Sequence, residues 1–289
     1  MSLLSNTWLV VLSILFGNAG ILHAASPLTQ FWKASTQGGQ YHTPTPAELQ
    51  QAEILFLQTL TRQGTLQELQ LAWATLGLEL VQVHEGREDW WVLREQPESK
   101  TGRGFYVFRL AGAKGVVIQA PHSGADRCTG EIALSLLREG VAKAAAWRTV
   151  PRQQADLAHL DATYFQAFTR AFAQTFPSGT VMQLHGFEQE KREGRSAGDA
   201  DIVLSNGTQT PPERLRQIGQ CWHRTLGVMV KLYPDDVKDL GATANAQAIL
   251  LHGMGHPGFL HIEMSPNVRE RLQQRKSERA MFLQCLDGE

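Results

Sequence analysis

The chain has 289 residues, of which 43% are hydrophobic and 19% are charged, and its formal net charge is -1 at pH 7. This length suits one large α/β domain or two small ones, and the composition is that of an ordinary globular protein. Because the charge is close to neutral, there is no bulk electrostatic attraction to nucleic acid or to an anionic membrane, and we expect neither as a partner.

The first residues, 1–24, are typical of an export signal. An apolar run from Trp8 to Phe16 is shorter than the ~20 residues that span a bilayer, and Ala24 and Ala25 suit cleavage. No Lys or Arg precedes the run, which leaves an uncleaved membrane anchor as the alternative. In either case we expect the body of the protein outside the cytoplasm, periplasmic or secreted.

We expect the remaining chain to divide into three parts. Residues 25–46 are polar and contain three prolines, which is typical of a linker. Residues 47–100 predict a helical hairpin followed by strands that pack on the core, because apolar side chains recur first at helical and then at strand spacing. Residues 101–289 predict the main α/β domain.

Strand-like segments begin at residue 80 and alternate with helical segments from about residue 129 onward. The expected strands cover residues 80–83, 90–93, 104–110, 115–120, 142–150, 180–184, 201–205, 228–233 and 259–264. The expected helices begin near residue 129 and cover residues 161–176, 211–226, 240–251 and 266–286. The alternation predicts a three-layer α/β/α sandwich with a mainly parallel or mixed central sheet. The charged segment 186–198 is either a mobile flap over a site or a solvated surface loop.

Three of the predicted strands run into residues that bind metals or carry protons. The strand at 115–120 is followed by His122 and Asp126, the strand at 180–184 by His185, and the last strand contains Glu263. In α/β proteins such groups gather at the carboxyl edge of the sheet. Two imidazoles, one carboxylate ligand and a second carboxylate as base are the components of a mononuclear hydrolytic zinc site.

The carboxylates of this set have alternatives. Asp126 can fold back toward His122, whereas Glu131 is the rival ligand and sits in the first turn of a helix, where an acidic side chain favours the helix dipole. Glu263 lies in an apolar strand, so it is either a general base or the partner of Arg269 or Arg271 in an ion pair. His261 shares a face with Glu263 and is either its partner or a core histidine.

The three cysteines, Cys128, Cys221 and Cys285, match no zinc-knuckle or redox spacing. Their odd number in an exported chain leaves at least one thiol free, and the sequence does not select a pair for a disulfide. Cys128 lies in the loop after the strand at 115–120, where it is either a nucleophile or, more commonly, a small residue beside a site.

Four short motifs occur in order between residues 104 and 285: PHSG after one strand, LHG after a second, DIVLS, and HIEMS before the last helix. Together they resemble the N-formylglutamate amidohydrolase-like and poly-γ-glutamate hydrolase-like branches of the zinc carboxypeptidase superfamily. The resemblance implies an α/β/α fold with one Zn2+, ligated by His122, Asp126 and His185. It also implies that Glu263 is the general base acting on a zinc-bound water.

The sequence departs from the superfamily pattern in two places. Zinc carboxypeptidases have His-x-x-Glu, whereas three residues separate His122 from Asp126. The Asn-Arg pair that holds a substrate carboxylate is absent as a dipeptide. We expect one of three arginines to replace it and His159 to line the pocket. The three arginines are Arg127, Arg148 and Arg195.

These observations predict an exported zinc-dependent hydrolase that cleaves an amide or peptide bond in an acidic, acyl-amino-acid or peptide substrate. The alternative is a periplasmic binding protein on the same scaffold that has lost catalysis. A third hypothesis is a metal-free hydrolase that uses Ser123 or Cys128 with His122, although no Gly-x-Ser-x-Gly elbow supports it.

Overall fold

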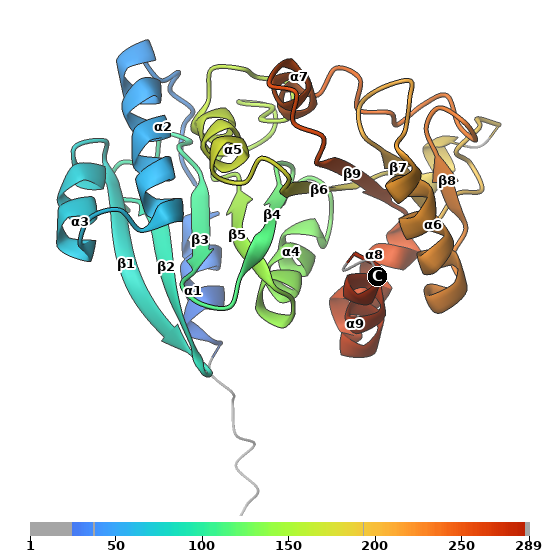
Figure 1. Cartoon of the computed structure of the whole chain (residues 1–289), viewed down its shortest axis with the longest axis horizontal. Coiled ribbons are helices and arrows are strands. Elements are labelled where there is room, and N and C mark those ends of the chain that lie inside the picture. Colours follow the sequence, from blue (N-terminus) through green and yellow to red (C-terminus); the bar gives the residue numbers. More distant parts are fainter. Residues whose placement is uncertain (1–24, 37, 193, 287–289) are drawn as a thin grey trace, which may run out of the picture.

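The computed structural model describes residues 25–36, 38–192 and 194–286, so the expected export signal at 1–24 lies outside the described residues. Within them the strands form one nine-stranded mixed sheet with the order β1-β2-β3-β5-β4-β6-β9-β7-β8. Helices cover both faces of the sheet (Figure 1), which confirms the three-layer α/β/α sandwich.

The strands have these bounds: β1 Leu78–Glu85, β2 Glu88–Glu95, β3 Phe105–Arg109, β4 Lys114–Ala120, β5 Ala142–Trp147, β6 Thr180–Gly186, β7 Ile202–Ser205, β8 Val230–Leu232 and β9 Phe259–Met264. One face packs against α2 (Pro46–Thr61), α3 (Leu66–Ala74), α5 (Tyr164–Thr175) and α7 (Ala246–Gly253). The other packs against α1 (Pro27–Ser35), α4 (Thr129–Glu139), α6 (Glu213–Leu226), α8 (Pro266–Gln274) and α9 (Lys276–Gln284).

The helical hairpin expected near the N-terminus is formed by α2 and α3. Each helix begins with a capping box, in which Thr45 pairs with Glu48 and Thr65 pairs with Glu68. In both, the threonine hydroxyl accepts from the backbone of the glutamate and the glutamate accepts from the backbone of the threonine. These bonds satisfy amides that a helix start otherwise leaves unpaired.

The bounds of some elements shift, since α7 begins at Ala246 and not at residue 240, and β5 ends at Trp147 and not at residue 150. Two segments differ in kind. The segment 25–46, expected as a linker, contains α1, whose Leu28 and Trp32 are buried in the core. Their spacing after Ser26-Pro27 is that of a short amphipathic helix. The helix expected over 266–286 is two helices, because Arg275 has an extended backbone between α8 and α9.

A disulfide joins α6 to the end of α9, two of the helices that pack on the same face of the sheet as α4. Cys221 of α6 is bonded to Cys285 at the end of α9, and Cys128 is the free thiol. Trp222 of α6 also stacks on Phe282 of α9, with ring centroids 4.2 Å apart. The described residues include no helix with the length and apolar character needed to cross a membrane.

The centre of the sheet is parallel. Strands β5, β4, β6 and β9 are neighbours that run in the same direction. The register places Gln119 of β4 beside Gln183 of β6, and His185 of β6 beside Glu263 of β9. The three strand ends singled out in the sequence therefore meet at one carboxyl edge of the sheet.

Candidate metal centre

His122 and Asp126 lie in the turn that follows β4. The backbone amides of Gly124, Ala125 and Asp126 lie 2.8, 2.8 and 2.9 Å from the carbonyl oxygen of His122. This tight turn brings the Asp126 side chain back to the His122 imidazole. The guanidinium of Arg148 packs against Gly124, since a Cβ atom at position 124 would lie 2.6 Å from its Nη2 atom.

Three side-chain atoms face one another at this edge of the sheet. Nδ1 of His122 lies 3.1 Å from Nδ1 of His185. Oδ2 of Asp126 lies 3.4 Å from the former nitrogen and 3.6 Å from the latter. Ligand atoms placed tetrahedrally at ~2.1 Å from a zinc ion are about 3.4 Å apart. The three separations therefore match the edges of a zinc-ligand tetrahedron.

The opposite ring nitrogens determine where the imidazole hydrogens lie. Nε2 of His122 lies 2.7 Å from Oδ1 of Asp156, and Nε2 of His185 lies 2.9 Å from Oε1 of Gln183. Both partners are oxygen acceptors, so in the neutral rings Nε2 carries the hydrogen and Nδ1 presents a lone pair. Two nitrogen lone pairs and the carboxylate of Asp126 then converge, and none of the three supplies a hydrogen to the others. A bound cation satisfies such an arrangement, so these residues fit a zinc ion.

The pKa values of these groups agree with this arrangement. Burial lowers the pKa of His185 to about 4, so its ring is neutral at neutral pH. Burial opposes ionisation of Asp126 and His122, but the charged forms attract each other and the Asp156 carboxylate also stabilises a protonated His122, and these interactions outweigh the burial. The pKa of Asp126 is lowered well below its usual value and that of His122 is raised. The pKa of His122 is raised because the carboxylates of Asp126 and Asp156 favour a positive charge between them, and a bound cation would supply that charge.

Glu263 stands beside these groups on the neighbouring strand. It is the register partner of His185, its side chain is 13% exposed, and Oε1 lies 3.7 Å from Nε2 of His261. Burial, followed by repulsion from Asp126, raises the pKa of the Glu263 carboxyl group to about 8. A carboxyl group perturbed in this way beside a cluster of metal-binding side chains is a candidate for proton transfer.

The alternative ion pair of Glu263 with a helix α8 arginine does not form. Arg269 pairs with Glu188 at 2.9 Å, and Arg271 pairs with Glu278 at 2.8 Å. In the described part of the chain, the contact with His261 is the one ion-pair contact of Glu263.

Two further groups of metal-binding side chains adjoin the centre. They are His122 with Asp156 and His159, and His185 with His261 and Glu263. In the first, Asp156 already accepts from the ring of His122 and from Nε of Arg152, the latter at 2.9 Å. The second group shares His185 with the three proposed ligands, His122, Asp126 and His185, and it places Glu263 beside them. Both groups therefore extend the same centre.

A cavity of about 560 Å3 opens onto these side chains. His159, which we expected to line the pocket, does line it, together with Arg152, Lys191 and Arg192. Arg195, one of the three arginines expected to hold a substrate carboxylate, is exposed and lines neither this cavity nor the one beside it. Asp126, Glu188 and Glu263 line it as well, so the cavity carries charges of both signs.

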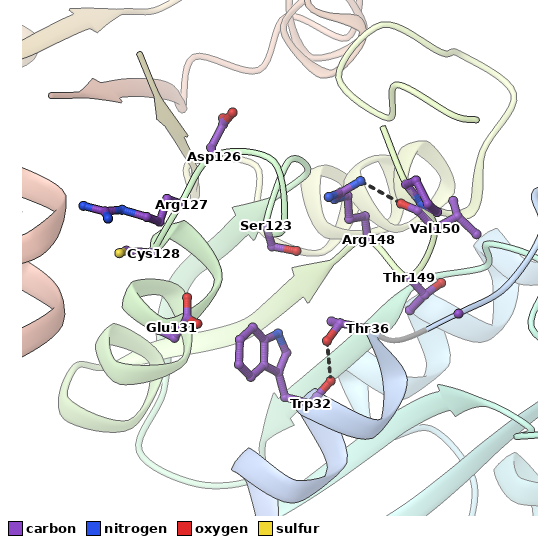
Figure 2. Close-up of a pocket in the computed structure, with 13 residues that line it drawn as sticks. Trp32, Thr36, Ser123, Asp126, Arg127, Cys128, Glu131, Arg148, Thr149 and Val150 are labelled. Carbon is purple, nitrogen blue, oxygen red and sulfur yellow. Dashed lines mark hydrogen bonds between the residues drawn. The ribbon is translucent and has the colours of Figure 1, made fainter. Parts of the chain in front are cut away.

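A second cavity of about 340 Å3 adjoins the first, and Asp126 lines both. Figure 2 shows that Arg148 lies on its far side from Arg127, whose side chain extends away from Arg148. Nη1 of Arg148 donates to the carbonyl oxygen of Val150 at 2.9 Å. Glu131 also lines this second cavity, so Asp126 is the carboxylate that lies with the two histidines.

Neither Ser123 nor Cys128 is arranged as a nucleophile. Both ring nitrogens of His122 face other side chains, and the Cys128 thiol lies 3.2 Å from Oε1 of Gln273. Burial raises the pKa of the Cys128 thiol, whereas an activated cysteine has a lowered pKa. The geometry therefore disfavours the metal-free hydrolase hypothesis.

The charged segment 186–198 contains the short 3-10 helix η1 (Gln189–Arg192) and contributes to the lining of the larger cavity. Two ion pairs hold it in place: Glu188 with Arg269 at 2.9 Å, and Arg192 with Asp239 at 2.6 Å. The segment therefore belongs to the site and is attached to helix α8 and to the loop before α7.

Two residues that contact the site histidines have no motif that identifies them. Asp156 lies 34 residues from its partner His122, in an irregular segment. Gln183 precedes His185 by two residues, so both side chains lie on one face of β6. The sequence could have indicated Gln183, because it is a polar residue within an otherwise apolar strand. It could not have indicated Asp156, because no regular spacing relates this residue to His122.

Comparison with known proteins gives likenesses of fold. No protein-family model matches the sequence, and no curated protein matches it. The structure is similar to an N-formylglutamate amidohydrolase from Ralstonia eutropha JMP134, with 14% identity and a TM-score of 0.47 over 61% of this chain and 94% of that one. It is also similar to a bacteriophage poly-gamma-glutamate hydrolase, with 11% identity and a TM-score of 0.36 over 63% and 88%. A zinc-free structure of the protein YNDL gives 18% identity and a TM-score of 0.39 over 64% and 90%.

Both branches that the sequence motifs resemble therefore appear among the structural neighbours. At these sequence identities the similarity concerns the fold alone. The assignment of the site residues comes from the geometry of this chain.

Proposed function

We propose that this chain is an exported zinc-dependent hydrolase that cleaves an amide or peptide bond in an acidic, acyl-amino-acid or peptide substrate. One observation carries the proposal. The lone pairs of His122, Asp126 and His185 converge at zinc-ligand separations, beside the buried carboxyl group of Glu263.

The ion and the protein divide the chemistry between them. When bound, a zinc ion supplies polarisation of the scissile carbonyl and lowers the pKa of water to about 7. Glu263 accepts a proton from the attacking water at its carboxylate and delivers it to the amide nitrogen as the carbon–nitrogen bond breaks. Its pKa of about 8 applies to the metal-free protein. In the zinc-loaded protein we expect a lower value, because a nearby cation favours the carboxylate.

The basic residues around the two cavities support an acidic substrate. Arg148 lines the smaller cavity together with Asp126 and retains donors on its guanidinium beyond the one bonded to Val150. A planar guanidinium can hold a carboxylate with two parallel hydrogen bonds, which would fix the scissile bond relative to Glu263. Arg127 remains a second candidate for this role on the exposed rim of the same cavity.

Export is part of the proposal. The disulfide between Cys221 and Cys285 supports it, because structural disulfides persist in oxidising compartments and are rare in the cytosol. The apolar run near the N-terminus supports it independently.

The test combines metal analysis with activity. The purified protein is expected to contain about one zinc ion per chain and to hydrolyse acyl-amino acids or glutamyl peptides until a chelator is added. His185→Ala should lose the zinc, whereas His84→Ala should retain it, because His84 is exposed and pairs with Asp89. Full zinc occupancy in His185→Ala contradicts the metal assignment.

A second variant separates the enzyme from a binding protein. Glu263→Gln should keep zinc and substrate affinity but lose turnover, because the amide cannot accept the proton. A protein that binds an acidic ligand yet turns over none of these amides, with or without zinc, would instead support the binding-protein alternative.

A further inference from the structure

Beneath the metal centre lies a cluster of buried amide side chains that the proposed chemistry does not use. Gln119, Gln183 and Gln247 are 0% exposed, and Asn245 is 3% exposed. They come from three separate places in the chain: β4, β6 and the start of α7. Gln183 is the member that reaches the centre, because its Oε1 atom lies 2.9 Å from Nε2 of His185.

The direction of each amide in this cluster can be derived from groups that have only one hydrogen-bonding role. The hydroxyl of Thr169 donates to the carbonyl oxygen of Phe165 at 2.8 Å, so its oxygen accepts from its other neighbour, Nε2 of Gln119, at 2.8 Å. Oε1 of Gln119 therefore faces Gln183 and must receive a hydrogen from Nε2 of Gln183, at 3.0 Å.

Gln247 imposes the same direction from the other side. Its Nε2 donates to the backbone carbonyl of Leu157 at 2.9 Å, and a carbonyl can only accept. Oε1 of Gln247 is thereby turned to Nε2 of Gln183, at 3.0 Å. Both hydrogens of the Gln183 amide are thus assigned to Gln119 and Gln247.

Asn245 gives a third, independent constraint. Its Oδ1 accepts from the backbone amides of Gln247 and Ala248, both at 3.0 Å, as the cap of α7. Its Nδ2 is therefore the atom that donates to Oε1 of Gln183. All three constraints present the carbonyl oxygen of Gln183 to His185, and none permits the reverse orientation without leaving buried groups unpaired.

We propose that Gln183 is a positioning residue that holds His185 as the Nε2–H tautomer, so that the Nδ1 lone pair faces Asp126 and His122. The proposal rests on the proposed function in one respect, because it takes His185 as a metal ligand. The amide cluster presets this ligand before any ion arrives, since its hydrogen bonds end on backbone groups and on Thr169. Orientation of a ligating histidine by such a partner is worth about 10–100-fold in metal affinity.

The first measurement is the tautomer of His185 in the metal-free protein at pH 7.5. Long-range 1H–15N correlation spectra distinguish the two neutral tautomers, and the His185→Ala variant identifies the signals. Wild-type protein is expected to show the Nε2–H form. An Nδ1–H form in the wild type overturns the proposal without any variant of Gln183.

The second measurement compares Gln183→Met with Gln166→Met. Methionine fills a similar volume but accepts no hydrogen bond of comparable strength. Gln166 belongs to the same cluster, donating to the carbonyl oxygen of Ala246 and accepting from Gln247, but it does not contact His185. Gln183→Met is expected to mix the tautomers and to weaken zinc binding about 10–100-fold, and Gln166→Met to change neither.

A conservative variant gives the complementary result. In Gln183→Glu, a protonated carboxyl group can still accept from His185 with one oxygen and donate with the other, so we expect the tautomer and most of the zinc affinity to be retained. Equal losses of zinc affinity in Gln183→Met and Gln166→Met, or a loss without a change of tautomer, would overturn the positioning role. Zinc binding that survives His185→Ala would refute the metal assignment, while the spectra would still decide the role of Gln183.

Discussion

Replacing Glu263 by glutamine is expected to stabilise the metal-free protein at pH 8 and to leave its stability near pH 4 unchanged. Burial raises the pKa of this carboxyl group from 4.5 to about 8 in the folded protein. Between these two values the unfolded chain has released the proton, whereas the folded chain still holds it. The free energy of unfolding of the wild type therefore falls as the pH rises through this window.

The size of the effect follows from the shift. The difference between 8 and 4.5 is 3.5 pKa units, which at about 1.4 kcal/mol per unit gives an upper bound of about 5 kcal/mol. The side chain is 13% exposed, and water or a small relaxation can solvate the charge. We therefore expect the variant to gain on the order of 1–4 kcal/mol over the wild type at pH 8. Glutamine has nearly the same shape and does not ionise, so it removes the pH-dependent part alone.

The assay is urea unfolding at pH 4, 6 and 8 in the presence of a chelator. Glu213→Gln is the matched control, because the Glu213 side chain is 68% exposed and its replacement should change stability little at any pH. A stability difference between Glu263→Gln and wild type that does not grow with pH would refute the reasoning. A less stable variant at pH 8 would refute it as well.

Three further predictions concern the partners of the site and the covalent link. Asp156→Ala removes the acceptor of the His122 Nε2 hydrogen and should weaken zinc binding about 10–100-fold, as measured by competition with a chelating dye. Arg148→Ala should raise the KM for an acidic substrate about 10–100-fold and leave the zinc content unchanged, since the guanidinium lies beside the centre without contributing a ligand atom. Reducing the bond between Cys221 and Cys285 should lower the free energy of unfolding by about 2–4 kcal/mol in denaturant titrations, because it closes a loop with a sequence separation of 64.

Each of these has an outcome that contradicts it, which for the disulfide is a free energy of unfolding that reduction leaves unchanged. Unchanged zinc affinity in Asp156→Ala would mean that His122 needs no outer partner. A loss of zinc in Arg148→Ala would mean that this arginine supports the fold of the centre. Cys128→Ser serves as the control for the disulfide, because Cys128 is the free thiol and its replacement leaves the covalent link intact.

Local signals were sufficient for most of the secondary structure. Thr45 and Thr65, each followed three residues later by a glutamate, mark the starts of α2 and α3, and apolar runs mark the central strands. The helix α1 was hidden among prolines and polar residues in a segment of linker-like composition. No Pro or Gly lies near Arg275, so no local signal indicates that the helix expected over 266–286 is interrupted there. The first error arises because burial of Leu28 and Trp32 against the sheet face overrides composition.

The sequence by itself determined which strands end in metal-binding or acidic side chains. An apolar run that leads to His122, His185 or Glu263 is a local pattern, which can be recognised without the fold. Only the tertiary structure decided that β4, β6 and β9 are adjacent and parallel, so that these ends share one edge. It also decided which oxygen atoms hold the outer nitrogens of the histidines. Hydrogen-bond partners drawn from separate elements leave no periodic trace in the sequence, since what joins them is the packing of the folded chain.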